Sequence, residues 1–346
     1  MIFTRNEIRF LRLYKSGLIV PYKNSDELLS RCDIQAQSIN DALFNIKQRI
    51  SDDDIQKCVD EMKVIRNWTL RNTLHFISID KYIEVVKINN LLGTWFERIY
   101  LKTDKEKASY EKAKSVFKQE YLIDKQMLLE NGVIKSHITN WQGIFINLTK
   151  DGLLLSKHKK HCISTKGNFP NKENVTRTSI SDLAIYYFEN YGPATLQDFC
   201  HWSGLKVRDV QNLVNIPDVR FKVDEAKLWY STEDLKLRDK FLKDKIKIPD
   251  CLILAKFDPL CLGYNDKSWL SGKCFESDIW GRTGIVEAVI LNHGEISAIW
   301  RKNGKTIYVK PLSKKFNKIR ATAKKIFSDN FDEEIIVKEV QNFENI

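Results

Sequence analysis

The cysteine and histidine residues are the first candidates for metal or redox chemistry in this chain. None of the seven cysteines lies in a C-x-x-C pair, and the six histidines form no H-E-x-x-H pattern. Scattered thiols of this kind are typical of a reduced, cytosolic protein rather than of a zinc site or a disulfide framework. We therefore expect no bound metal ion and no cofactor.

Basic residues offer a different chemistry, the neutralisation of phosphate. The chain holds 56 Lys+Arg against 45 Asp+Glu, a formal net charge of +11. Such an excess favours a polyanionic partner, nucleic acid first and an anionic membrane surface second. The stretch from Arg301 to Lys325 holds ten basic residues and no acidic one, and a second cluster follows Ser156. The candidate phosphate contacts in these two stretches are Lys157, Lys159, Lys160, Arg301, Lys302, Lys314 and Lys315.

A lysine-rich, solvated face would give the same pattern, because a bias towards Lys raises the net charge without any DNA function. Composition therefore leaves both interpretations open. The length of 346 residues and the 43% hydrophobic content predict two or three folding units with cores of their own. No stretch approaches the roughly 20 apolar residues of a membrane span. The charged first ten residues lack the apolar region of a signal peptide, so we expect a cytoplasmic protein.

The first hundred residues have a pattern of short helices followed by a hairpin. Apolar residues at helical spacing predict four helices, and a segment rich in β formers predicts a hairpin interrupted at Arg71-Asn72. The predicted helices cover 5–17, 25–32, 38–50 and 54–65, and the hairpin covers 68–77. Helices that end in a hairpin are typical of a winged helix-turn-helix.

The same pattern recurs twice. Helices are predicted within 105–130, followed by paired strands over 133–138 and 143–148, and a linker rich in Gly, Pro, Asn and Ser over 163–174. The clearest unit comes next, with predicted helices at 182–190, 196–202 and 206–214 and a hairpin at 219–230. A unit of this kind places a helix in a DNA groove, although many such domains mediate protein contacts instead.

Beyond residue 235 the sequence changes to short strands. Strands are predicted at 251–257, 284–291, 295–300 and 306–310, closed by a helix over 316–327. They favour a small antiparallel sheet or partial barrel. The expected fold class is therefore α+β, with tandem winged helices at 1–103, 104–165 and 180–234 and a C-terminal β domain with a basic helix at 235–346.

Several phrases of the sequence, in the family's order and over nearly the whole chain, resemble the AlkZ/YcaQ winged-helix DNA glycosylases. The two most specific read Gly-Pro-Ala-Thr…Trp-Ser-Gly-Leu and Phe-Asp-Pro…Leu-Gly-Tyr. All the resembling phrases lie at 12–18, 34–37, 68–75, 191–205 and 257–266. The resemblance implies three winged helices and a β domain in a C shape around a DNA channel. It also implies a monomer that excises alkylated bases, bulky N7-guanine adducts and interstrand crosslinks included, from double-stranded DNA in the cytoplasm, associated with the nucleoid.

The family's catalytic signature is Gln-apolar-Gln or Gln-apolar-Asp, and the resemblance assigns it here to Gln35 and Gln37, the Gln-x-Gln branch. The family usually reads Arg-Gly-Thr-x-His where this chain has Asn72 in place of the glycine. Because Asn tolerates a positive φ better than other non-Gly residues, we expect the turn to persist.

Other residues near the signature have two interpretations each. Arg71 is a candidate for contact with DNA phosphate, and the alternative is that it is a plain surface charge. His75 is a candidate for DNA contact, and the alternative is that it makes a structural hydrogen bond. Asp33 either orients water or caps a helix. Trp68 is expected to pack in a core, with contact to a DNA groove as the alternative, and Trp202 is expected to pack between the helices of the third winged helix.

Two amides suit only one kind of lesion. Hydrolysis of an N-glycosidic bond passes through an oxocarbenium-like sugar, and a 7-alkylguanine already carries the positive charge that its departure neutralises. A glutamine can orient water and stabilise the cationic sugar, but it is not a useful general base. We therefore expect a monofunctional glycosylase with water as the nucleophile. The alternative is a non-catalytic DNA-binding regulator, expected to be a dimer that reads two half-sites.

Overall fold

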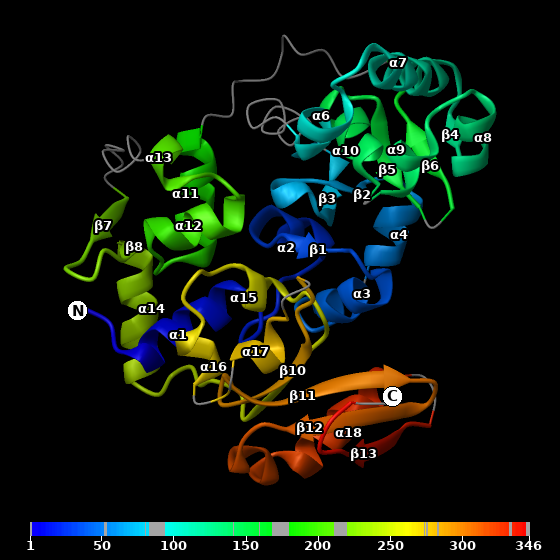
Figure 1. Ribbon diagram of the computed structural model, residues 1–346. Helices are drawn as coiled ribbons and strands as arrows, with labels where there is room; N and C mark the ends of the chain where they lie inside the picture. The colour runs from blue at the N-terminus through cyan, green and yellow to red at the C-terminus, as the bar shows by residue number, and fades with distance from the viewer. Residues whose placement is uncertain are drawn as a thin grey trace.

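The computed structural model describes residues 2–51, 54–79, 81–82, 94–140, 142–158, 160–167, 180–210, 220–272, 274, 276–281, 284–331 and 334–343. The first part of the chain is a helical group that carries a three-stranded sheet of order β1-β3-β2 (Figure 1). The elements are α1 (Arg5–Lys15), α2 (Ser25–Arg31), β1 (Ile34–Gln35), α3 (Ile39–Lys47), α4 (Ile55–Asp60), β2 (Val64–Trp68) and β3 (Leu74–Ser78). The predicted helix at 54–65 is thus shorter, because Val64 and Ile65 pair with β3 instead.

The second group also ends in a three-stranded sheet, of order β4-β6-β5. Its elements are α6 (Trp95–Tyr100), α7 (Asp104–Gln119), β4 (Leu122–Ile123), α8 (Lys125–Glu130), α9 (Lys135–Thr139), α10 (Gly143–Lys150), β5 (Leu154–Lys157) and β6 (Cys162–Ser164). The predicted strands at 133–138 and 143–148 are wrong, because α9 and α10 occupy them. Residues 143–149 are all buried, and a short buried helix has no polar face to separate it from a strand. Trp68 packs on this helix, stacked 5.8 Å from Phe145, which confirms its core role.

The third group matches its prediction closely over the described residues. It holds α11 (Ile180–Tyr191), α12 (Leu196–Ser203), α13 (Val207–Val210), β7 (Phe221–Val223) and β8 (Trp229–Ser231). A capping box between Thr195 and Asp198 begins α12, and Gly204, at φ 78°, ends it. Trp202 is buried against α11, as expected. The predicted third helix beyond 210 and the linker beyond 167 lie outside the described residues.

A helix and a five-stranded sheet complete the chain. α14 (Thr232–Leu242) packs on α1, with Phe241 stacked 4.3 Å from Phe10. The sheet has the order β13-β12-β11-β10-β9. Its strands are β9 (Cys251–Leu254), β10 (Ala288–Asn292), β11 (Glu295–Asn303), β12 (Thr306–Pro311) and β13 (Ile336–Glu339), and α15 (Pro259–Leu262), α16 (Ser268–Ser271) and α17 (Glu276–Ile279) lie between β9 and β10. The antiparallel prediction is correct for β9 to β12. β13, which was not predicted, pairs parallel to β12.

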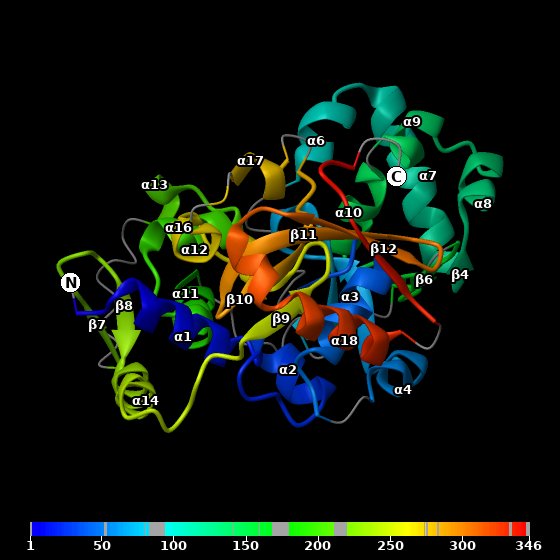
Figure 2. The same cartoon turned by 90° about the horizontal axis from the view of Figure 1, so that it is seen from below.

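The helix α18 (Arg320–Asn330) covers one face of that sheet, with α3 next to it (Figure 2). Phe44 of α3 reaches the same apolar core, and Gln48 donates a 2.8 Å hydrogen bond to Asn330. Arg49, which follows α3 in the chain, is fully buried, and its Nη2 lies 2.7 Å from Oδ1 of Asp258, the N-cap residue of α15. Breaking such a pair leaves an uncompensated charge in the core. The first group is therefore fixed to the C-terminal sheet.

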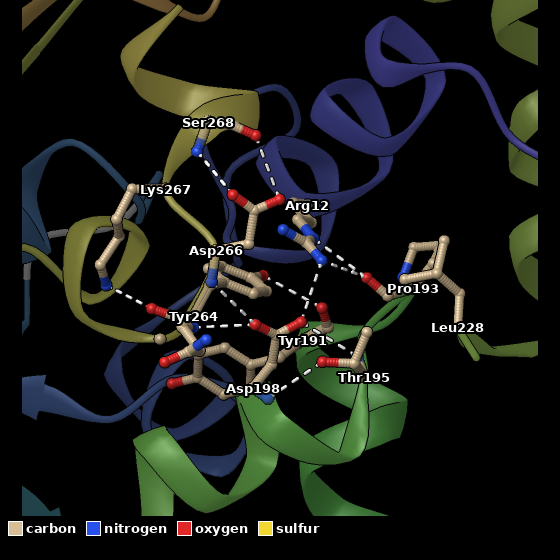
Figure 3. A network of polar contacts seen from close by, with 12 residues as sticks. Arg12, Tyr191, Pro193, Thr195, Asp198, Leu228, Tyr264, Asp266, Lys267 and Ser268 are labelled. Atoms are coloured by element: carbon tan, nitrogen blue, oxygen red, sulfur yellow. Dashed lines mark hydrogen bonds and ion pairs between the residues drawn. The ribbon is translucent and has the colours of Figure 1, made fainter. Parts of the chain in front are cut away.

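Three of the resembling phrases meet in one buried network (Figure 3). The Arg12 guanidinium of α1 donates two hydrogen bonds, of 3.0 and 2.8 Å, to the Pro193 carbonyl, and it lies over the ring of Tyr264. The Asp198 carboxylate accepts from the backbone amides of Thr195 and Asn265. These three sequence segments therefore connect α1, α12 and the segment after β9, and in this way they hold the helical groups together.

Candidate active site and nucleic-acid interface

Gln37 follows β1 on an exposed turn, and the oxygen of its side chain is held by a hydrogen bond. Its Oε1 accepts a 3.0 Å hydrogen bond from the amide of Leu74, at the start of β3. The Arg66 guanidinium donates to the carbonyl oxygens of Ala36 and Gln37 and so holds the turn itself. A carboxamide oxygen has two lone pairs. The Gln37 oxygen can thus keep its backbone partner and still accept a hydrogen bond from water.

Gln35 lies deeper, in β1, with 5% of its surface exposed. It pairs with His75 of β3 in the strand register. Its Oε1 accepts a long hydrogen bond, of 3.5 Å, from Nη2 of Arg71. Gln35 is therefore held beneath the surface that Gln37 occupies.

Arg71 and Asn72 form the tight turn of the first hairpin, both at φ 57°. The expectation that Asn would keep this turn without glycine is confirmed. The Arg71 guanidinium points inward, 3.5 Å from the Leu262 carbonyl, and burial lowers its pKa. Gly204 of the third group packs on it so closely that an added Cβ would lie 3.2 Å from the Arg71 Cγ. Arg71 thus joins the first hairpin to the third group and to the segment after β9.

His75 is buried, with 3% of its surface exposed, and its Nδ1 lies 2.7 Å from the Thr69 hydroxyl. Burial, and next the charge of Arg71, lower its pKa to about 3, so the ring is neutral. This is the structural hydrogen bond that the sequence offered as an alternative. Contact with DNA at Arg71 and His75 stays a prediction.

Asp33 does not cap a helix, so that interpretation is wrong. Cys32 ends α2 and Ser38 begins α3. The Asp33 carboxyl is buried, which raises its pKa, while the charges of Lys81 and Arg71 and the hydroxyls of two tyrosines oppose the rise. Asp33 lies next to Tyr191, because its backbone amide donates a 3.2 Å hydrogen bond to the Tyr191 hydroxyl.

Gln37 lines a cavity of about 350 Å³ between the first and second groups, here called the glutamine cavity. Three basic side chains line it as well, Arg66 from β2, Lys125 from α8 and Lys157 from β5. Lys157 is mostly buried, which lowers its pKa, and its Nζ donates to the His158 carbonyl. Of its predicted neighbours, Lys160 is exposed and Lys159 lies outside the described residues.

A second cavity, of about 480 Å³, opens between α3 and the five-stranded sheet; we call it the sheet cavity. Ser38 and Asn40 line both cavities, so the two meet at the start of α3. Arg301 and Lys302 of β11 line the sheet cavity, whereas Lys314 and Lys315 line neither. The predicted basic run is therefore divided between two surfaces.

Several cavity residues were missed by the sequence analysis. They lie far apart in the chain and carry no motif of their own, so no local signal could have grouped them. They are Asn40, Arg66, Lys125, Gln142 and Lys256. Within the described ranges, no group of three or more His, Cys, Asp or Glu is placed to hold a metal ion. No described helix is long and apolar enough to cross a membrane.

Residues 155–326 match the family model described as DNA glycosylase AlkZ-like. This part of the chain is therefore similar to the AlkZ-like family. The fold agrees with that of the Streptomyces sahachiroi DNA glycosylase AlkZ, at a TM-score of 0.77 and 16% identity over 98% of this chain and 100% of that one. A comparison with curated proteins gives no match. Gln35 and Gln37 precede the matched range, so this similarity does not depend on them.

Proposed function

We propose that this AlkZ-like protein is a monofunctional DNA glycosylase that hydrolyses the N-glycosidic bond of cationic N7-alkylguanines in double-stranded DNA, bulky adducts and crosslinks included. One observation carries the proposal. The anchored side chain of Gln37 lines a concave surface together with three basic residues from two different groups. Of the two glutamines in the Gln-x-Gln signature, Gln37 would then be catalytic and Gln35 would support it.

In the proposed reaction, water attacks C1′ of the damaged nucleotide. The new bond joins the water oxygen to C1′, the bond from C1′ to N9 breaks, and its electron pair neutralises the charged purine. The water loses its proton to solvent. The Gln37 oxygen orients the water and faces the sugar as positive charge develops. Gln35, held by Arg71, supports the turn from below.

Basic side chains on both sides of Gln37 supply the grip on DNA. Arg66, Lys125 and Lys157 would contact phosphates on one side, and Arg301 and Lys302 on the other. Contacts to phosphate carry no sequence information, which suits a protein that must bind damage anywhere. We propose that the protein acts as a monomer in the cytoplasm, on nucleoid DNA.

Purified protein incubated with methylated duplex DNA should release 7-methylguanine and leave intact abasic sites. Released bases are measured by liquid chromatography, and strand breaks by gel electrophoresis with and without alkali. Binding without base release would overturn the glycosylase and favour the regulator. Strand cleavage without alkali would overturn the monofunctional mechanism.

A further inference from the structure

The sheet cavity holds a set of groups that the proposed reaction does not use. One wall is aromatic, with Phe44 of α3 stacked 5.7 Å from Phe331 and tilted at 5.6 Å from Trp300. The first turn of the same helix carries Asn40 and Asp41, which line the cavity beside these rings. Its volume of about 480 Å³ falls in the range of small-molecule sites, which are apolar clefts with a few placed polar groups.

The polar groups that line this cavity include both a hydrogen-bond acceptor and hydrogen-bond donors. Asp41 is partly buried, and among the described residues no side chain or amide donates a hydrogen bond to its carboxylate. Lys302 and Asn303 on β11 are donors across the cavity, with the Lys302 ammonium 5.2 Å from the Phe331 ring centre. A planar ligand in the cavity would meet an acceptor on α3 and donors on β11.

Guanine presents the complementary pattern. Its N1–H and N2 amino groups are donors that a carboxylate accepts together, and its O6 is an acceptor for lysine or an amide. Adenine offers one amino donor beside the N1 lone pair, which a carboxylate repels. Aromatic side chains bind any base face, so the aromatic wall adds affinity, and the choice of base depends on Asp41.

The position of the cavity connects it to the reaction. Because Ser38 and Asn40 line both cavities, the sheet cavity adjoins the place where a base would leave its sugar beside Gln37. We propose that the sheet cavity is a guanine-binding subsite that receives the excised base, with Asp41 as the residue that selects guanine over adenine. This inference rests on the proposed glycosylase function.

The test compares Asp41→Asn with wild type on one methylated duplex, which carries both 7-methylguanine and 3-methyladenine. Because Asp41 would hold the departing guanine while its bond to C1′ breaks, loss of the carboxylate should lower release of 7-methylguanine about tenfold, the worth of one good base-edge contact. Release of 3-methyladenine should stay unchanged or rise. Equal effects on both bases, or none on either, would overturn the subsite.

A matched control separates base selection from helix stability. Asp26 is an exposed acid in the first turn of α2, and it lines neither cavity. Asp26→Asn removes the same charge from a helix N-terminus and should leave the ratio of the two released bases at its wild-type value. A ratio that shifts as much as in Asp41→Asn would show a general charge effect and reject the role of Asp41.

Binding of the free base tests the subsite without catalysis. Equilibrium dialysis with 7-methylguanine should show one site on the wild-type protein, about tenfold weaker in Asp41→Asn. Undetectable binding of 7-methylguanine, or affinity for 3-methyladenine equal to it, would contradict the subsite. If wild type released no base yet bound 7-methylguanine, the proposed function would fail and the subsite would stand.

Discussion

The two glutamines of the signature have different surroundings, and this difference sets their expected roles. Gln37 is exposed and lines the glutamine cavity, with its oxygen anchored to the Leu74 amide. Gln35 is buried beside Arg71 and pairs with His75 in the strand register. A side chain that must meet water and a sugar has to be reachable, so we assign the proposed chemistry to Gln37 and a supporting role to Gln35.

The neutral, buried His75 makes stability depend on pH. Its folded pKa of about 3 lies below the ordinary value of 6.5, so its contribution is complete above pH 6.5 and is lost as the pH falls towards 3. Urea unfolding of wild type and His75→Gln should show the wild-type advantage shrinking by about 2 kcal/mol between pH 7 and pH 5. An advantage that stays constant over that range would contradict the burial of a neutral ring.

At the scale of elements, the turn between β2 and β3 carries the connection of the first hairpin to the third group. Residues 71 and 72 both have positive φ, and Gly204 packs directly against Arg71. The chain therefore accepts backbone strain at a non-glycine residue in order to place one guanidinium inside the protein.

Substitution of Asn72 tests this turn. Asn72→Val should destabilise the protein by about 1–2 kcal/mol, the penalty of a branched side chain in the left-handed region. Asn72→Gly should stay within about 1 kcal/mol of wild type, because relief of strain offsets the greater freedom of the unfolded chain. Urea unfolding measures both variants, and an Asn72→Val protein as stable as wild type would show that the turn has another conformation.

Elements with their own local signals could be predicted from the sequence, and those defined by tertiary contacts could not. The N-caps at Ser38 and Thr195 and the turn at Gly204 mark their helices directly. The sequence of α10 is rich in β formers and buried over residues 143–149, so its helical state depends on packing that no local pattern records. The parallel pairing of β13 likewise depends on a partner across the sheet.

At the scale of the whole molecule, the site is made by the approach of distant segments. The Gln35–Gln37 turn was predicted from the sequence by family resemblance, and Lys157, Arg301 and Lys302 from their charge, but Arg66 and Lys125 were not predicted. Lys125 of α8 lines the glutamine cavity and Lys302 of β11 lines the sheet cavity because the fold brings the second group and the sheet to the start of α3. Net charge predicted a polyanionic partner without showing where it binds.

Lys125 offers a test of the proposed DNA surface. Lys125→Ala should weaken binding to any duplex and reduce the slope of log affinity against log salt by about 1, the loss of one phosphate contact. Lys107→Ala, an exposed lysine on α7 that lines neither cavity, is the control and should keep the wild-type slope. Fluorescence anisotropy over a salt series measures both, and equal slopes in the two variants would place the DNA elsewhere.

The most direct test of the account is single-turnover release of 7-methylguanine by Gln37→Ala, with circular dichroism and duplex affinity measured on the same preparation. We predict that the wild type releases the base. The variant should fold and bind as wild type does, with release slowed at least about a hundredfold, as for loss of one oriented polar group in a transition state. A folded Gln37→Ala protein that releases 7-methylguanine at the wild-type rate would contradict the central claim.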